Sequence, residues 1–308
     1  MITVAAISVS DKKGIKKTNI PFATLQDNFG IVCDVHAGFV HRQVSFLSTS
    51  SIEKMKAAGL DVKSGDFAEN ITLEGINIEA VSTGDILEIN NVEFIVTQLG
   101  KICHQRCAIF YSAGDCVMPR EGFFSIVKGN GKIKVGDTVL HHKKTKLTGA
   151  VITLSDRAHQ GLRMDETGPG IVDFLKKTFE FAFIRYEVIA DEKIQLENLV
   201  IDLTDSQKID LIITNGSTGV AKRDIAPDVT EKIIERRLPG FEEAMRLNSF
   251  KKTPYAIISR AVCGTRHNSL IINLPGAPIA AIENLETISG AIEHTIKKLQ
   301  GDTSDCGL

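Results

Sequence analysis

The sequence lacks both a long apolar run and a large excess of one charge. Among its 308 residues no apolar stretch approaches the roughly 20 residues that a membrane-spanning helix needs. The formal net charge is −2, with 17 basic and 15 acidic residues up to position 146 and 19 basic and 23 acidic residues after it. Neither part has the basic excess that drives binding to a phosphate backbone, so we expect no nucleic-acid partner and no membrane contact.

The six cysteines lack the spacing of a disulfide framework. Cys103, Cys107 and Cys116 cluster in one short segment, and the other three are scattered. The N-terminal stretch 1–10 is apolar but short and has no basic region before it, so we interpret it as a strand and not as a signal peptide. We therefore expect a cytoplasmic protein with reduced thiols.

The apolar pattern changes at a basic stretch, residues 141–146. Before it, short alternating stretches at 86–89, 92–97 and 133–135 are separated by Gly, Asn and Asp turns, which is typical of β-strands. Only residues 51–58 predict a helix. We expect a β-rich, barrel-like domain at 1–142, followed by a linker at 143–147.

The remaining chain, 148–308, has the pattern of an α/β domain. Continuous apolar runs at 150–154 and 210–214 predict central parallel strands. Helical periodicity appears at 170–179, 192–203 and 227–237. Further apolar runs at 256–259 and 270–273 precede a final helix from 278 to about 299. This alternation predicts a three-layer α/β domain with a mostly parallel sheet.

A glycine-rich turn after one of these strands is suited to binding phosphate. Backbone N–H groups between a parallel strand and a helix point toward anions at the carboxyl end of the sheet. Gly216 and Gly219 can take positive φ, and the hydroxyls of Ser217 and Thr218 add donors. With Thr214, these residues form the candidate phosphate-binding turn.

Charged residues follow this turn directly. Asp224 and Asp228 would suit Mg²⁺ held against phosphate oxygens, and Lys222 and Arg223 could neutralise charge on a transferring phosphoryl group. A solvated turn, in which Asp228 only favours the start of a helix, explains the spacing about as well. The segment matches neither the G-x-x-x-x-G-K-[ST] loop nor the G-x-G-x-x-G fingerprint.

Polar and glycine residues near other strands strengthen the binding hypothesis, because ligands collect at strand ends in open α/β sheets. The candidates in these segments are Ser155, Asp156, Gly168, Asp191, Ser269, Pro275 and Gly276.

Residues 147–300 resemble the molybdopterin adenylyltransferase family (MogA/MoaB-like, shared with the G domain of gephyrin) along essentially the whole domain. The matching motifs are Thr-x-Gly-x-Thr-Gly at 214–219, Arg-Asp-x-x-Pro-Asp at 223–228, Leu-Pro-Gly-Phe at 238–241 and Leu-Ile-Ile-Asn-Leu-Pro-Gly at 270–276. The resemblance implies binding of molybdopterin and Mg-ATP, transfer of AMP onto the pterin's terminal phosphate, and a homotrimer. It places Asp191 and Asp224 at the family's essential acidic positions, with Asp228 near the metal or nucleotide. Ser217 stands where the family more often has glycine.

The cysteine segment in the first part of the chain suggests thiol chemistry. Lys101, His104 and Arg106 surround Cys103 and Cys107, and nearby cations favour the reactive thiolate. Arg42 with Lys101 and Arg106 could form an anion pocket. A structural zinc site is disfavoured, because three thiols and one histidine would have to wrap awkwardly around the metal. Burial as a small hydrophobe weighs about evenly for Cys116 and more heavily for Cys33.

Residues 1–140 resemble the MOSC domain, through Asp-Val-His-Ala-Gly at 34–38, Arg-Gln-Val-Ser at 42–45, the segment 65–71 and the segment 98–107. The resemblance implies a β-rich module that binds molybdenum cofactor, in which some members use a cysteine to ligate the metal or carry sulfur. Spacing from Gln98 favours Cys103, whereas the Arg-Cys pair favours Cys107.

Both resemblances point to the same cofactor. The first hypothesis is a fused molybdenum-cofactor biosynthesis protein, in which one domain adenylylates molybdopterin and the other binds, carries or sulfurates the finished cofactor. The second is a non-catalytic carrier or scaffold that delivers cofactor to molybdenum enzymes or other biosynthesis proteins, and Ser217 is its main support. The third is a sulfurtransferase whose thiol accepts persulfide sulfur.

Overall fold

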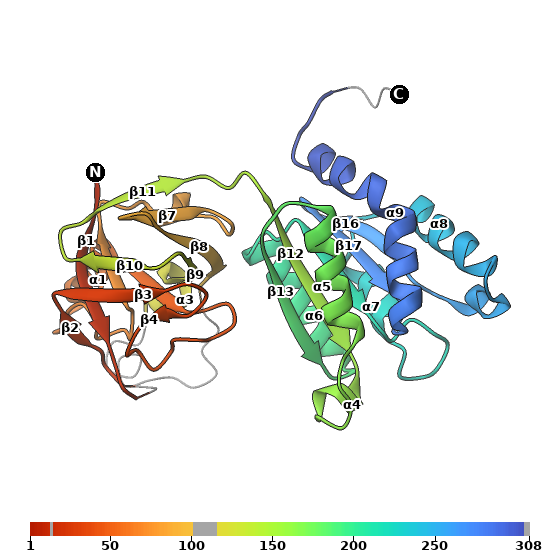
Figure 1. The fold of residues 1–308 in the computed structure, drawn as a ribbon, viewed down its shortest axis with the longest axis horizontal. Helices are drawn as coiled ribbons and strands as arrows, with labels where there is room; N and C mark the ends of the chain where they lie inside the picture. Colours follow the sequence, from red (N-terminus) through yellow and green to blue (C-terminus); the bar gives the residue numbers. More distant parts are fainter. Residues whose placement is uncertain (13–14, 101–115, 305–308) are drawn as a thin grey trace. The chain divides into compact units, whose positions relative to one another are not determined.

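The computed structural model describes residues 1–12, 15–100 and 116–304. The chain divides into two compact units, Met1–Thr145 and Lys146–Leu308 (Figure 1). Within the described ranges, no helix combines the length and the apolar character needed to cross a bilayer.

The first unit is built mainly from strands. Its elements are β1 (Ile2–Val9), β2 (Thr18–Ile20), β3 (Phe22–Gln26), β4 (Gly30–Ile31), β5 (Val44–Ser48), α1 (Thr49–Ala57), β6 (Ile71–Glu74), η1 (Ile78–Ala80), β7 (Ile86–Ile89), β8 (Val92–Leu99), α3 (Met118–Glu121), β9 (Phe123–Lys128), β10 (Gly131–Lys134) and β11 (Thr138–His142).

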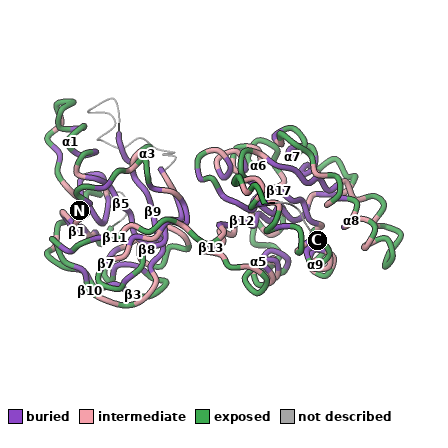
Figure 2. Tube along the Cα trace, turned by 90° about the horizontal axis from the view of Figure 1, so that it is seen from above, coloured by how far each residue is buried: buried purple, intermediate pink, exposed green. Residues whose placement is uncertain are grey.

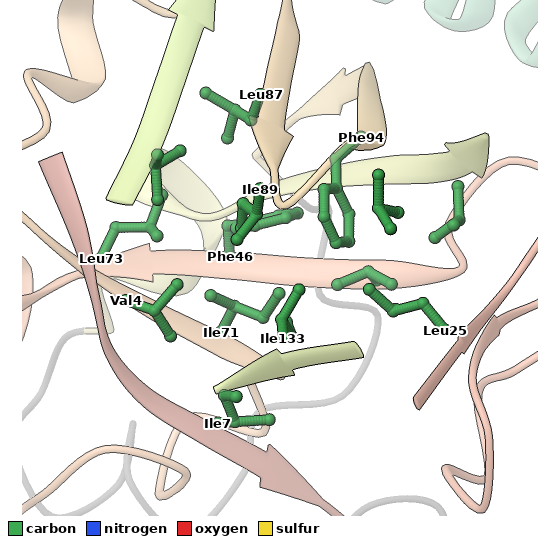
Figure 3. Packing of buried hydrophobic residues seen from close by; sticks show 14 of the residues in the cluster. Val4, Ile7, Leu25, Phe46, Ile71, Leu73, Leu87, Ile89, Phe94 and Ile133 are labelled. Carbon is green, nitrogen blue, oxygen red and sulfur yellow. The ribbon is translucent and has the colours of Figure 1, made fainter. Parts of the chain in front are cut away.

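Seven of these strands close into a ring. Their order is β11-β7-β8-β9-β5-β6-β1, and β11 pairs back onto β1, with Ile2 opposite Val139. Alternate side chains of the strands point inward, and Figure 3 shows Phe46 and Phe94 among the aliphatic side chains that fill the interior. The expected β-rich barrel is therefore confirmed.

Buried Asp85 anchors the end of this unit. Its carboxylate accepts hydrogen bonds from the backbone N–H of Lys144 (3.0 Å), His141 Nε2 (2.8 Å) and Lys143 Nζ (3.1 Å). Burial alone would raise the pKa of Asp85, but these bonds outweigh it and lower the pKa. The chain is thus attached to the barrel as far as Lys144.

The second unit alternates strands and helices. Its elements are β12 (Leu147–Leu154), α4 (Asp156–His159), α5 (Thr167–Thr178), β13 (Phe181–Ile189), α6 (Lys193–Ile201), the π-helical turn η2 (Asp202–Ser206), β14 (Leu211–Asn215), α7 (Ala226–Ile233), β15 (Arg236–Arg237), α8 (Pro239–Phe250), η3 (Pro254–Ile258), β16 (Cys263–Arg266), β17 (Ser269–Leu274) and α9 (Pro278–Leu299).

These strands form one sheet between two layers of helices. The order is β13-β12-β14-β17-β16-β15; the first three pairings are parallel and the last two antiparallel. Helices α5, α8 and α9 share one apolar cluster with the strands, and Figure 2 shows α6 and α7 on the opposite side of β12 and β17 from α5 and α9. The expected three-layer, mostly parallel α/β domain is confirmed.

Two local predictions for this unit were inaccurate, and one helix was missed. The apolar run 256–259 lies largely in the 3₁₀ turn η3, because Pro254 follows Thr253, whose hydroxyl caps the turn by accepting a hydrogen bond from Tyr255 N. The helix expected at 227–237 ends at Ile233, and Arg236–Arg237 pairs with β16 as a strand. Helix α8 was not predicted from the sequence.

Candidate functional site

The carboxyl ends of three parallel strands meet at one edge of the sheet. Thr153 in β12 pairs with Asn215 in β14, which pairs with Leu274 in β17, so the loops after these strands begin side by side. The N–H of Gly216 donates to the carbonyl of Leu274 across this edge (3.1 Å). A cavity of about 440 Å³ opens here, lined among others by Ser155, Asn215, Gly216, Ser217 and Gly276.

Glycine is required at one position of this edge and packs tightly at a second. Gly216 has φ +91°, and a Cβ there would lie 2.5 Å from the carbonyl oxygen of Leu154. A Cβ on Gly276 would lie 3.2 Å from the Cα of Gly216. The two loops therefore approach each other backbone to backbone.

Ser217 joins the glycine turn to the start of α7. Its φ is +58°, a left-handed conformation that glycine adopts at no steric cost. Its hydroxyl donates to the carbonyl of Arg223 (3.0 Å) and accepts from the N–H of Ile225 (2.8 Å). Serine thus takes a backbone conformation suited to glycine and adds two hydrogen bonds.

Arg260 holds the turn from outside, a role that the sequence analysis missed. Its Nε donates to the carbonyl of Gly219 (2.7 Å), Nη2 to the carbonyl of Asp224 (2.6 Å) and Nη1 to Asp228 Oδ1 (2.7 Å). Its own N–H donates to the carbonyl of Thr218 (3.0 Å). The sequence signal was weak, since Arg260 is a single basic residue after the apolar run 256–259.

The two acidic candidates on the turn lie around this guanidinium. Asp224 Oδ2 accepts from the N–H of Ala221 (2.7 Å), and Asp228 lies in the first turn of α7. One oxygen of each carboxylate is therefore engaged. Within the described part of the chain, no three His, Cys, Asp or Glu side chains are grouped to hold a metal ion.

Asp156, Asp191 and Arg223 form a second group at the ends of β12 and β13. The N–H of Asp156 donates to Asp191 Oδ2 and the N–H of Asp191 donates to Asp156 Oδ1, both at 3.1 Å. Arg223 Nη2 lies 2.6 Å from Asp156 Oδ2 and 3.3 Å from Glu192 Oε1. The pair with Asp156 raises the pKa of Arg223, which therefore remains a cation. Lys222 is exposed beside it.

Asp165 organises the far wall of the cavity, and it was not among the predicted site residues. Its Oδ1 accepts from the N–H groups of Thr167 (2.9 Å) and Gly168 (3.2 Å), and its Oδ2 from Thr153 Oγ1 (2.5 Å) and Tyr186 OH (2.6 Å). Burial favours the neutral acid, but these hydrogen bonds outweigh it and lower the pKa of Asp165. Burial and the bond to Asp165 raise the pKa of Tyr186. A Cβ on Gly168 would overlap the Tyr186 ring.

Known proteins match both units. Residues 150–294 match the model of the probable molybdopterin binding domain, and residues 33–140 match that of the MOSC domain. Over 156 residues the chain is 42% identical to the molybdopterin adenylyltransferase of Helicobacter pylori (strain ATCC 700392 / 26695), spanning 49% of this chain and 87% of that protein. The chain belongs to the molybdopterin adenylyltransferase family.

Other family members cover the same unit. The molybdopterin adenylyltransferase of Escherichia coli (strain K12) is 37% identical over 142 residues, 46% of this chain and 73% of that protein. The solved structure of the molybdopterin biosynthesis enzyme MoaB from Thermus thermophilus has 38% identity and a TM-score of 0.47, covering 51% of this chain and 98% of that one. The two family-model matches, at 33–140 and 150–294, confirm the expected fusion of a MOSC domain with a domain of the molybdopterin adenylyltransferase family.

Some predicted family residues lie away from the cavity. Thr214 is fully buried in β14, where its hydroxyl accepts from Asn273 Nδ2 (2.8 Å). Ser269 begins β17, at the opposite end of the strand from Gly276, and it lines a different hollow. Pro275 borders a separate cavity of about 250 Å³ with Thr218 and Gly219. The structure does not bring Thr214 and Ser269 to the candidate site.

The MOSC unit contains a buried ion pair that involves its Asp-Val-His-Ala-Gly motif. Asp34 Oδ2 lies 2.8 Å from Lys17 Nζ, and both side chains are almost fully buried. His36 Nδ1 lies 3.3 Å from Asp34 Oδ1. Burial opposes ionisation of Asp34, yet the bonds to His36 and Lys17 lower its pKa. Arg42 stacks near the Phe124 ring, with Cζ 5.8 Å from the centroid.

Only some of the predictions for cysteines fall on residues that the structure describes. Cys103 and Cys107, with the flanking Lys101, His104 and Arg106, lie outside the described residues. Cys116 is buried, in line with its interpretation as a small hydrophobe. The same expectation was wrong for Cys33, which is exposed with φ +73° in the loop after β4.

Proposed function

We propose that the second unit transfers AMP from Mg-ATP to molybdopterin. One observation carries the proposal: the loops after three parallel strands, with Gly216 and Ser217 of the glycine turn, border a single cavity, and Arg260 fixes the turn from outside. The names of the family members that cover this unit support the same reaction. In it, a terminal phosphate oxygen of molybdopterin bonds to the α-phosphorus of ATP, the bond to the β-phosphate breaks, and pyrophosphate leaves.

This reaction asks the protein mainly to position phosphates and neutralise their charge. The N–H of Gly216 is bound to the carbonyl of Leu274, and the N–H groups that follow it in the turn would donate to phosphate oxygens. Arg223 and Lys222 supply positive charge beside the turn, with Arg223 held toward the sheet by Asp156. Asp191 sets the position of Asp156, because the backbone N–H of each residue donates to the carboxylate of the other.

The acidic residues fit a magnesium ion that arrives with the nucleotide. Mg²⁺ is usually bound by one or two carboxylates together with substrate phosphates and water. Asp224 and Asp228 each use one carboxylate oxygen for a contact within the protein, and each retains a second oxygen. When bound, the ion would stabilise negative charge on the reacting phosphates.

The test is AMP transfer by the purified full chain with molybdopterin, Mg²⁺ and labelled ATP. We expect adenylylated pterin from the wild type and none from Asp224→Asn, with folding intact. Asp173→Asn, which changes an exposed carboxylate on α5, is the matched control and should retain activity. Molybdopterin binding without product in the wild type would contradict an enzyme and favour the carrier. The main sequence argument for a carrier has weakened, because Ser217 adopts a left-handed backbone conformation suited to glycine.

We further propose that the MOSC unit binds or carries the cofactor, or its sulfur, through a cysteine, with Cys103 preferred over Cys107. The match at 33–140 supports a cofactor-binding module, and Arg42 would contribute to binding an anionic ligand. Sulfane sulfur or molybdenum retained on the wild type should be lost in Cys103→Ser and retained in Cys33→Ser. Equal retention in both Cys103→Ser and Cys107→Ser would contradict the assignment.

The remaining assignments follow from the family. We propose a MOSC-like domain at 1–142, a linker at 143–147, a molybdopterin-binding domain at 148–308, and a cytoplasmic homotrimer that hands cofactor to molybdenum enzymes. Sedimentation of the full chain should give three times the monomer mass of 33.6 kDa. A monomer at micromolar concentration would contradict the trimer.

A further inference from the structure

A residue that lines the cavity has a buried amide with an unsatisfied polar atom. Asn215 ends β14, has only 1% of its surface exposed, and lines the cavity of about 440 Å³. Its Oδ1 is placed 2.9 Å from Thr153 Oγ1, and its Nδ2 has no hydrogen-bond partner among the described residues. An unsatisfied buried amide costs free energy, so this atom requires an explanation.

The neighbouring hydroxyl determines which way the amide is turned. Thr153 Oγ1 has one hydrogen but faces two acceptors, Asp165 Oδ2 at 2.5 Å and Asn215 Oδ1 at 2.9 Å. The carboxylate is charged and closer, and it therefore receives the hydrogen. Because its single hydrogen goes to Asp165, Thr153 Oγ1 has only a lone pair to offer Asn215, and Tyr186 OH donates to the same carboxylate oxygen.

A lone pair can be satisfied only by the NH₂ end of the amide. The two ends of an asparagine side chain have the same shape, and the hydrogen-bond network decides between them. Nδ2 therefore donates to Thr153, and Oδ1 takes the place without a partner. The buried, unsatisfied atom is a carbonyl acceptor.

We infer that Asn215 is a specificity-determining residue that accepts a hydrogen bond from an exocyclic amino group on a bound heteroaromatic ring. This inference rests on the proposed function, because both of its substrates carry such a group, the 2-amino group of the pterin and the 6-amino group of adenine. Thr153, Asp165 and Tyr186 are positioning residues that hold the amide with its oxygen toward the ligand. An oxo group at the same place would face Asn215 Oδ1, and these two acceptors could not form a hydrogen bond.

Paired ligands test the inference and identify the ring. Calorimetry would compare the full chain binding ATP with ITP, and a tetrahydropterin with its 2-oxo analogue. The wild type should prefer the amino member of one pair by about tenfold or more, and Asn215→Leu should bring that preference close to one. Asn198→Leu, the same change on an exposed face of α6, should retain the wild-type preference.

A second variant separates recognition from folding. Thr153→Val keeps the size of the side chain but removes the partner that orients the amide, and the preference should fall while binding of the amino ligand persists. If Asn215→Leu fails to fold, Asn215→Thr replaces it, and its preference should also fall. Equal affinities within both pairs for the wild type, or an unchanged preference in the Asn215 variant, would overturn the inference. AMP transfer separates the two proposals: turnover without amino preference contradicts only the inference, and preference without turnover contradicts only the enzyme.

Discussion

Arg260 and Asp228 form an ion pair across the mouth of the glycine turn, with Nη1 2.7 Å from Oδ1. The same guanidinium binds the carbonyls of Gly219 and Asp224, so one side chain connects the turn, the loop after it and the first turn of α7. An arginine with three engaged nitrogens is ordered by its partners, because its planar donors fit only one arrangement.

Replacing this arginine should loosen the turn. For Arg260→Ala we expect the free energy of unfolding of the second unit to fall by about 1–3 kcal/mol, since charge-assisted hydrogen bonds are lost. AMP transfer should fall at least about tenfold, because donors that move cannot hold phosphate in one geometry. Arg236→Ala, at exposed strand β15, is the control for removing an arginine. Full activity in Arg260→Ala would show that the turn keeps its shape without this side chain.

Ser217 offers a test of backbone conformation. Ser217→Ala keeps the cost of a left-handed Cβ residue and loses both hydroxyl bonds, so we expect about 1–3 kcal/mol of destabilisation. Ser217→Gly loses the same bonds but removes the backbone cost of about 1 kcal/mol, and it should be the more stable of the two. Thermal unfolding of both variants checks the order. Greater stability of the alanine variant would refute a left-handed backbone at this position.

Gly216 should tolerate no side chain. Gly216→Ala combines φ +91° with a Cβ 2.5 Å from the carbonyl of Leu154, and we expect loss of more than about 2 kcal/mol of stability together with loss of ligand binding. Gly290→Ala is the matched change in α9, where a Cβ meets nothing within 4 Å. That variant should be stabilised by about 0.5–1 kcal/mol, because alanine is the better helix former. Similar melting temperatures for the two variants would contradict this geometry.

Asp205 should make the second unit sensitive to acid. Hydrogen bonding to Arg266 is the main cause that lowers the pKa of Asp205 to about 2, from an ordinary value of 3.8. Because the unfolded chain binds the proton more readily, the stabilisation is present above about pH 4 and is lost as pH falls toward 2. Asp205→Asn should be less stable by about 1 kcal/mol at pH 7, and the difference should vanish near pH 2. Asp205→Glu keeps the charge and should retain part of the pH dependence, whereas a difference independent of pH would exclude this ion pair as its source.

The sequence predicted the architecture well because burial patterns are local. The run 150–154 lies inside β12, and 210–214 overlaps β14, since strands buried on both faces are apolar throughout. The alternation at 86–89 coincides with β7, because every second side chain of this strand is buried. Helix α8 was missed; it starts within the Leu-Pro-Gly-Phe motif at 238–241, where proline occupies the first helical turn.

The site was only partly predictable, because its contacts join distant segments. The motif at 214–219 indicated a turn, but nothing in its spacing indicates that Arg260 would bind Thr218 and Gly219 from 42 and 41 residues away. The orientation of Asn215 likewise depends on Thr153, Asp165 and Tyr186, which three separate segments supply. Ser269 was included with the strand and Pro-Gly turn that follow it, but it begins β17, whereas ligands collect where parallel strands end.

The pairing of Ile2 with Val139 places the first and last strands of the barrel next to each other. A module whose chain enters and leaves at neighbouring points can be spliced onto another protein without threading or rearranging its interior. The barrel can therefore be joined to other domains as a unit, and the same property should make it tolerant of circular permutation, with a new break in an exposed loop such as the one at Gly59.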